Sequence, residues 1–149
     1  MKDGHPKQKN LYLQSGQSLV EFGFGFMVLI IMLVSIVDLG RAIFTYMALR
    51  DAAQEGALVG SINPGNQSLI NERITNNSDL IYNLMSDPNS DIDVRITVFG
   101  SPCTGNSIRV EITYNNFPIT VPFLGTLIGK QTVPIKVQVT DTILSPACP

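Results

Sequence analysis

The chain has 149 residues, of which 44% are hydrophobic and 15% charged, which is enough material for one modest domain. It has no tryptophan and one histidine, His5, so that histidine would have to serve any Ser/His/Asp triad or histidine-ligated metal site. A formal net charge of −2 excludes the strongly basic surface that binds nucleic acid.

Residues 1–16 form a short basic leader. Gly4 and Pro6 disfavour a helix there, and the charged residues are Lys2, Asp3, Lys7 and Lys9. The next segment, residues 19–37, contains a single ionisable group, Glu21. It would span about 28 Å as a helix, close to the hydrocarbon thickness of a bilayer. We therefore predict a transmembrane helix.

The basic leader places the N-terminus in the cytoplasm and the remainder outside it, by the positive-inside rule. A buried core helix is the alternative to a membrane helix. A domain of this size, however, cannot surround a segment that is apolar on every side.

The helix is predicted to continue beyond the bilayer as a stalk. Residues 38–59 contain no proline and are rich in good helix formers, whereas Gly60 and then Asn63-Pro64-Gly65 favour a stop. Residues 17–60 would form one helix, on the order of 65 Å long.

Small residues recur every four positions along this stalk, at Ala48, Ala52, Gly56 and Gly60. Such a stripe lets another backbone approach closely. Its partner is the chain's own globular head, a neighbouring copy, or both in one assembly, and the sequence leaves these open.

Residues 61–149 are predicted to form an extracytoplasmic α+β head. Apolar residues at helical spacing indicate a short helix between Asn66 and Ser86, weakened in its middle by Asn76-Asn77-Ser78. Alternating patterns then predict strands at 92–98, 108–114 and 133–139, the first two as a hairpin, giving an antiparallel sheet of about three to four strands. Pro134 favours an edge strand or a strand start.

Two further pairs of residues suggest structural bridges. Asp38 and Arg41, three apart on one helical face, are expected to pair at the outer membrane boundary, as a structural ion pair or as an intersubunit contact. Cys103 and Cys148 are the only cysteines, and outside the cytoplasm they can form one disulfide that ties the C-terminal tail to the first hairpin. Two unpaired cysteines are the alternative.

The apolar run 121–129 has no regular period. Burial in the head, contact with the membrane and contact with another subunit all remain open for it.

The beginning of the apolar helix resembles the processing site of type IV prepilins, with Gly16-Gln17 at the end of the leader and Glu21 five residues after the glycine. In that family a membrane aspartyl peptidase cuts after the glycine, which here would make Gln17 the new N-terminus. A carboxylate in an apolar helix is costly unless it is paired. The new amine of an incoming subunit can therefore meet Glu21 of an assembled one and set their axial register.

The resemblance extends over roughly residues 16–60. Ile36-Val37-Asp38-Leu39-Gly40-Arg41-Ala42 and Ala48-Leu49-Arg50-Asp51-Ala52-Ala53-Gln54-Glu55-Gly56-Ala57 are similar to the N-terminal signature of TadE-like proteins of tight-adherence pilus systems. Many relatives carry a proline early in the apolar helix, near where this chain has Met27.

This resemblance implies a minor pilin or pseudopilin that is held in the cytoplasmic membrane and then joins a surface pilus used for adhesion. Its partners would be a prepilin peptidase, other pilin subunits in a homo- or hetero-oligomer, the pilus assembly platform and the lipid bilayer.

Other functions have weaker support in the sequence. An uncleaved signal anchor could present the head as a small β-rich binding module, and ordinary signal peptidase could release the head after Ala42. The carboxylates that could be considered for catalysis are Asp91, Asp93 and Glu111. They fall on predicted polar strand faces, where a solvated surface role is the simpler interpretation. We expect no catalytic residue, metal site or cofactor.

Overall fold

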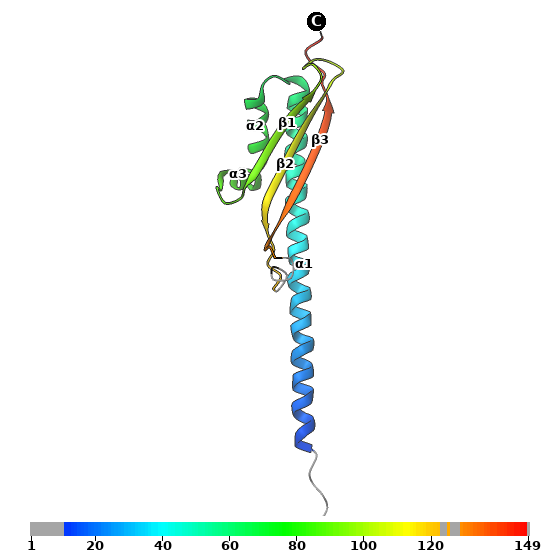
Figure 1. Ribbon diagram of the computed structural model, residues 1–149, viewed down its shortest axis with the longest axis vertical. Helices are drawn as coiled ribbons and strands as arrows, with labels where there is room; N and C mark the ends of the chain where they lie inside the picture. The colour runs from blue at the N-terminus through cyan, green and yellow to red at the C-terminus, as the bar shows by residue number, and fades with distance from the viewer. Residues whose placement is uncertain (1–10, 123–124, 126–128, 149) are drawn as a thin grey trace, which may run out of the picture.

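A single long helix organises the molecule. The structure is a computed structural model that describes residues 11–122, 125 and 129–148. Helix α1, Leu11–Ile62, runs the length of the molecule, with the head against its upper part and its lower part bare (Figure 1). The expectation of an α+β fold with a long N-terminal helix is confirmed.

Helix α1 begins six residues earlier than the predicted start at Gln17. The helix-breaking Gly4 and Pro6 precede Leu11, whereas residues 11–15 contain no breaker. The part of the leader before Leu11 lies outside the described residues. The helix is continuous past Met27, as expected where no proline interrupts it, and it ends just before Asn63-Pro64.

The predicted short helix is two helices, α2 (Gln67–Thr75) and α3 (Asp79–Ser86). Asn66 caps α2 by accepting a hydrogen bond from Leu69 N–H (3.1 Å), and Ser78 caps α3 by accepting one from Ile81 N–H (3.4 Å). Short polar side chains of this kind stabilise helix starts. Ser78 therefore begins a new helix at the point where the sequence weakens the first one.

The sheet consists of β1 (Ile92–Phe99), β2 (Ser107–Pro118) and β3 (Thr132–Thr142), antiparallel and in the order β1-β2-β3. The predicted hairpin is β1-β2, and Pro134 lies on the edge strand β3, as expected. Apolar residues align across the three strands, for example Val94, Ile112 and Val137. The sheet therefore presents one apolar face to α1.

A bulge in β2 turns one more aromatic residue onto that face. The register with β3 shifts between Tyr114 and Phe117, so two residues of β2, at 115 and 116, lie opposite the single residue Pro134 of β3. Tyr114 and Phe117 are consequently both buried, with their rings edge to face at 6.0 Å between centroids.

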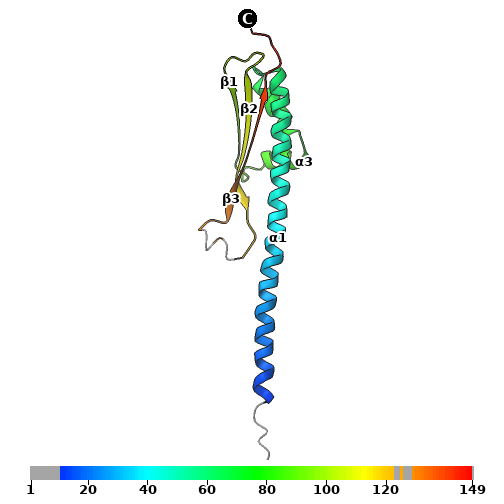
Figure 2. The same cartoon turned by 90° about the vertical axis from the view of Figure 1, so that its right-hand side faces the viewer.

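The core forms where α1 meets α2 and the sheet. Leu49, Ala52 and Ala53 of α1 are completely buried, and the other fully buried large side chains come mainly from α2, α3 and β2: Ile70, Ile74, Ile81, Ile108, Val110 and Ile112. The molecule thus has two layers, with the helices on one side of the sheet (Figure 2).

The small-residue stripe packs on the chain's own head. A Cβ atom added at Gly56 would lie 2.6 Å from Ile74 Cγ1, and one added at Gly60 would lie 2.6 Å from Ile108 Cδ1. Ala52 is fully buried and Ala48 is packed against the core. Of the two partners that the sequence left open, the head occupies this stripe.

The outer face of the sheet carries two of the three carboxylates considered for catalysis, Asp93 and Glu111, whereas Asp91 precedes β1. Asp93 lies 3.6 Å from Arg95, and Glu111 lies 2.9 Å from Lys136. The hydrogen bond from Lys136 holds the pKa of the Glu111 carboxyl below its ordinary value. These carboxylates are ion-paired surface groups.

The C-terminal tail closes the end of the head farthest from the bare helix. Cys103 and Cys148 form a disulfide with a Cα–Cα distance of 5.0 Å. Thr104 N–H donates to Pro146 O at 2.8 Å, and Leu144 N–H donates to Ser61 O at 2.8 Å. The tail therefore joins the β1-β2 loop to the last turn of α1.

Replacing Gly56 by Val should destabilise the head by about 1–3 kcal/mol, because the added side chain overlaps Ile74 in a closed interface. Thermal unfolding of the detergent-extracted protein measures the change. Gly40→Val is the matched control, since nothing lies within 4 Å of a Cβ there. Equal losses of stability in the two variants would contradict the packing described.

Unfolding the unreduced protein should expose no thiol that reacts with Ellman's reagent, because both cysteines are bonded. Reduction should lower the stability of the head by up to about 4 kcal/mol, since the bridge closes a long loop. Two reactive thiols per unreduced chain would rule the bridge out.

Candidate functional site

The lower part of α1 is an apolar helix that no described part of the chain covers. The most apolar 18-residue window of Gly16–Ile62 has a mean hydropathy of 2.5 and no buried residue. Phe22 and Phe24, for example, are 74% and 71% exposed. This rejects the alternative of a buried core helix, and by length and composition the helix can cross a membrane.

Glu21 lies near the start of this bare segment and is exposed. It forms no ion pair or hydrogen bond within the part of the chain that the structure describes. Gly16 and Gln17, the predicted processing site, lie about one turn earlier in α1, and nothing stands within 4 Å of a Cβ at Gly16. The site is accessible, and its glycine makes the helix easier to unwind there.

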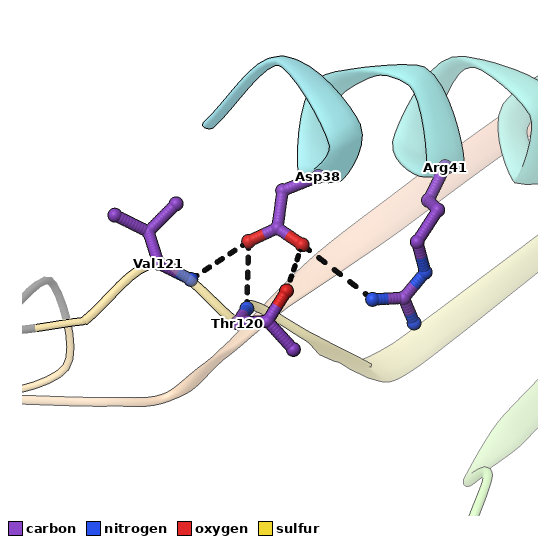
Figure 3. Close-up of polar contacts among 4 residues, drawn as sticks. All are labelled: Asp38, Arg41, Thr120 and Val121. Carbon is purple, nitrogen blue, oxygen red and sulfur yellow. Dashed lines mark hydrogen bonds and ion pairs between the residues drawn. The ribbon is translucent and has the colours of Figure 1, made fainter. Parts of the chain in front are cut away.

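Asp38 holds the lower tip of the head against α1 (Figure 3). Its carboxylate accepts hydrogen bonds from the backbone N–H of Thr120 (2.6 Å) and of Val121 (2.9 Å), and from the Thr120 hydroxyl. Only 6% of Asp38 is exposed. A buried carboxylate with several donors is a strong attachment, because hydrogen bonds to a charged group exceed neutral ones.

The expected pair between Asp38 and Arg41 is present but is the weaker part of this attachment. Arg41 Nη1 lies 3.5 Å from Asp38 Oδ1, and the Arg41 side chain is 45% exposed. The guanidinium also lies over the ring of Phe117, 5.6 Å from its centroid. Arg41 thus links Asp38 to the end of β2.

We call Asp38, Thr120 and Val121 the head clamp. Thr120 and Val121 follow β2 at a chain separation of more than eighty residues from Asp38, and sequence reasoning missed both. Asp38 is the residue after the apolar segment 19–37, so the clamp fixes where the bare helix ends and the head begins. Most of the apolar run that starts at Val121 lies outside the described residues.

Replacing Asp38 by Asn should loosen the lower tip of the head, because a neutral amide loses the charge and one of the acceptor oxygens. We expect cleavage by a protease between Pro118 and Lys130 to become about tenfold faster. Asp51→Asn, on an exposed position of the same helix, is the control. Arg41→Gln should change the rate less, and unchanged cleavage in Asp38→Asn would argue against the clamp.

The chain matches the model of one protein family, the TadE-like proteins, over residues 16–58. No curated protein and no solved structure gives a match. The matched segment contains Gly16, Glu21, the whole bare helix, the clamp residue Asp38 and most of the small-residue stripe. Over this segment the chain is similar to TadE-like proteins, which supports a pilus-associated protein, and its long helix is suited by length and composition to crossing a membrane.

Proposed function

We propose that this protein is a structural pilin-like subunit, a minor pilin or pseudopilin, that is processed after Gly16 and assembles into a tight-adherence pilus. The observation that carries the proposal is that the TadE-like segment, which begins at Gly16, coincides with a bare apolar helix that contains Glu21. The subunit serves surface adhesion through the pilus and performs no catalysis itself.

Before assembly the subunit lies in the cytoplasmic membrane as a single-pass protein, with its N-terminus in the cytoplasm and its head outside. Two features support this orientation. In the sequence the leader with Lys2, Lys7 and Lys9 precedes the apolar segment, whereas the head follows it. The disulfide also suits an oxidising, extracytoplasmic compartment.

A prepilin peptidase acts on the bond between Gly16 and Gln17. Both residues are exposed in α1, so the peptidase has access but must unwind the helix locally. Gly16 lowers the cost of that unwinding by about 1 kcal/mol relative to alanine. Cleavage creates an amine about one turn before Glu21.

Glu21 sets the register between subunits. It has no partner among the described residues of its own chain, and an unpaired carboxylate in an apolar environment is costly. The amine of an incoming subunit neutralises it, which favours docking on other pilin subunits at the assembly platform.

The mass and N-terminal sequence of the protein from its native membrane test the processing step. We expect a start at Gln17 that depends on the prepilin peptidase, and Gly16→Val should keep the full-length mass. A start at Met1 would favour an uncleaved signal anchor that presents the head as a binding module. A start at Ile43 would mean that the helix is a discarded signal and would contradict the proposal.

Replacing Glu21 by Ala should leave membrane insertion and cleavage intact and reduce incorporation into sheared surface filaments by at least about tenfold, because the charge pair is lost. Asp51→Ala, an exposed carboxylate elsewhere on α1, is the control. Normal filaments in the Glu21 variant would contradict the role in register.

A further inference from the structure

A cavity of about 240 Å³ lies where α1, α3 and the end of β2 meet. This volume is many times the space that a single water needs. Most of its lining is apolar and consists of leucine, phenylalanine and proline side chains from the three elements. We call it the α1-α3 cavity, and its polar lining residues are Arg41, Thr45 and Tyr114.

The two hydroxyl groups that line this cavity have no hydrogen-bond partner. Thr45 is 8% exposed and Tyr114 is 7% exposed, and neither side chain forms a hydrogen bond within the described residues. Hydroxyls elsewhere on the helices differ, since those of Ser35, Thr75 and Ser86 each donate to the carbonyl four residues earlier. A hydroxyl that is more than nine-tenths buried and unbonded is costly unless a bound molecule completes its hydrogen bonds.

Both hydroxyl oxygens open into the cavity. Among the described residues, no side-chain nitrogen or oxygen atom is both cut off from open space and without a hydrogen-bond partner. The unbonded oxygens of Thr45 and Tyr114 therefore still reach open space, and the cavity is the space that both residues line. Burial raises the pKa of the Tyr114 hydroxyl, and the charge of Asp87 raises it further. The hydroxyl therefore stays protonated and can donate a hydrogen bond.

Arg41 adds a positive charge with unused donors to the same cavity. Its Nη1 lies 3.5 Å from Asp38 Oδ1, whereas Nε and Nη2 donate to no residue that the structure describes (Figure 3). The Asp38 carboxylate is itself occupied by the N–H groups of Thr120 and Val121. The guanidinium is therefore free to bind a further anion with its remaining N–H groups.

The three polar groups converge on one place. Arg41 and Thr45 are four positions apart and so share a face of α1. Phe117 connects them to β2, because its ring centroid lies 5.6 Å from the Arg41 guanidinium carbon and 6.0 Å from the centroid of the Tyr114 ring. A guanidinium with nearby hydroxyl donors is suited to bind the oxygens of a phosphate group.

The position of Arg41 along α1 indicates where such a phosphate comes from. Arg41 lies four residues after the segment 19–37, which is about 6 Å beyond a span that already covers the hydrocarbon of a bilayer. The headgroup layer on each side of that hydrocarbon is on the order of 5–8 Å thick. When α1 crosses a membrane, the guanidinium therefore lies at the depth of the phospholipid headgroups.

We propose that the α1-α3 cavity binds the phosphate group of a phospholipid from the leaflet nearest the head, with Arg41, Thr45 and Tyr114 as its hydrogen-bond donors. The apolar walls, which include Leu80 and Leu84 of α3, contact the glycerol and the beginning of the acyl chains. The inference requires α1 to lie in a bilayer. It requires neither processing after Gly16 nor assembly, so it stands or fails separately from the proposed function.

Titration of the full-length, detergent-extracted and delipidated protein tests the site, followed by native mass spectrometry and by the melting temperature. The probes are dihexanoyl phosphatidylglycerol, dihexanoyl glycerol, which lacks the phosphate, and inorganic phosphate, which lacks the apolar part. We expect one phospholipid per chain, bound at least about tenfold more tightly than either other probe.

Three results of this titration would overturn the proposal. Equal binding of dihexanoyl glycerol would show that the cavity recognises apolar surface alone. Equal binding of inorganic phosphate would show a site for free phosphate and not for a lipid. Absence of phospholipid binding would leave the cavity without the proposed ligand.

Removal of the two hydroxyls is the sharpest variant. Thr45→Val combined with Tyr114→Phe deletes oxygen atoms that bond nothing within the described chain, so the lipid-free melting temperature should stay within a few degrees of wild type. Affinity for dihexanoyl phosphatidylglycerol should fall at least about tenfold, because hydrogen bonds to a charged group are lost. Tyr82→Phe, at an exposed tyrosine of α3, is the control. Unchanged affinity in the folded double variant would overturn the proposal.

The charge is tested in the same way. Arg41→Gln should weaken phospholipid binding at least about tenfold, whereas Arg50→Gln, at an exposed position of α1 farther from the apolar segment, should not change it. Equal phospholipid affinities in these two variants would show that the lipid does not bind at Arg41 and would overturn the proposal.

Discussion

One continuous helix, α1, lies in two different environments: its upper part packs against the head, and its lower part is exposed. The rest of the structure depends on this difference. The upper part of α1 carries small residues so that the head can pack closely, as at Gly56 against Ile74. The lower part carries large apolar side chains that the head does not cover. Between the two stands Asp38, a buried charge in a position where it needs several donors. The head supplies them from Thr120 and Val121, so the polar clamp coincides with the change of surroundings.

Two carboxylates of α1, Asp38 and Glu21, differ in the same way. Asp38 is satisfied within its own chain and so contributes to the fold. Glu21 has no such partner among the described residues, although it stands in the most apolar part of the helix. Two carboxylates on one helix thus have different consequences. One fixes the head of its own subunit, and the other is left for a contact between subunits in the function that we propose.

Much of the fold could be predicted from the sequence because it rests on local pattern. The alternation through Ile108 to Tyr114 and the helix formers of 38–59 each specify one kind of element. Asn76 and Ser78 indicated an interruption between residues 66 and 86. A single polar cluster does not distinguish a bent helix from two separate helices. The bulge in β2 could be predicted only in part: Tyr114 and Phe117 are three positions apart, which breaks the period-two alternation of apolar residues. The head clamp was not readable, because Thr120 and Val121 bind Asp38 mainly through backbone N–H groups, which every residue but proline possesses.

The direction of the strands has a mechanical consequence. In both views β1, β2 and β3 run along α1, so their hydrogen bonds lie across the long axis of the molecule. A pull along that axis loads many of these bonds together in shear and does not open them one by one. The disulfide between Cys103 and Cys148 encloses both β2 and β3 in a covalent loop. Tension therefore cannot extend the chain between these two cysteines. The head is therefore built to bear tension in the direction in which its helix points.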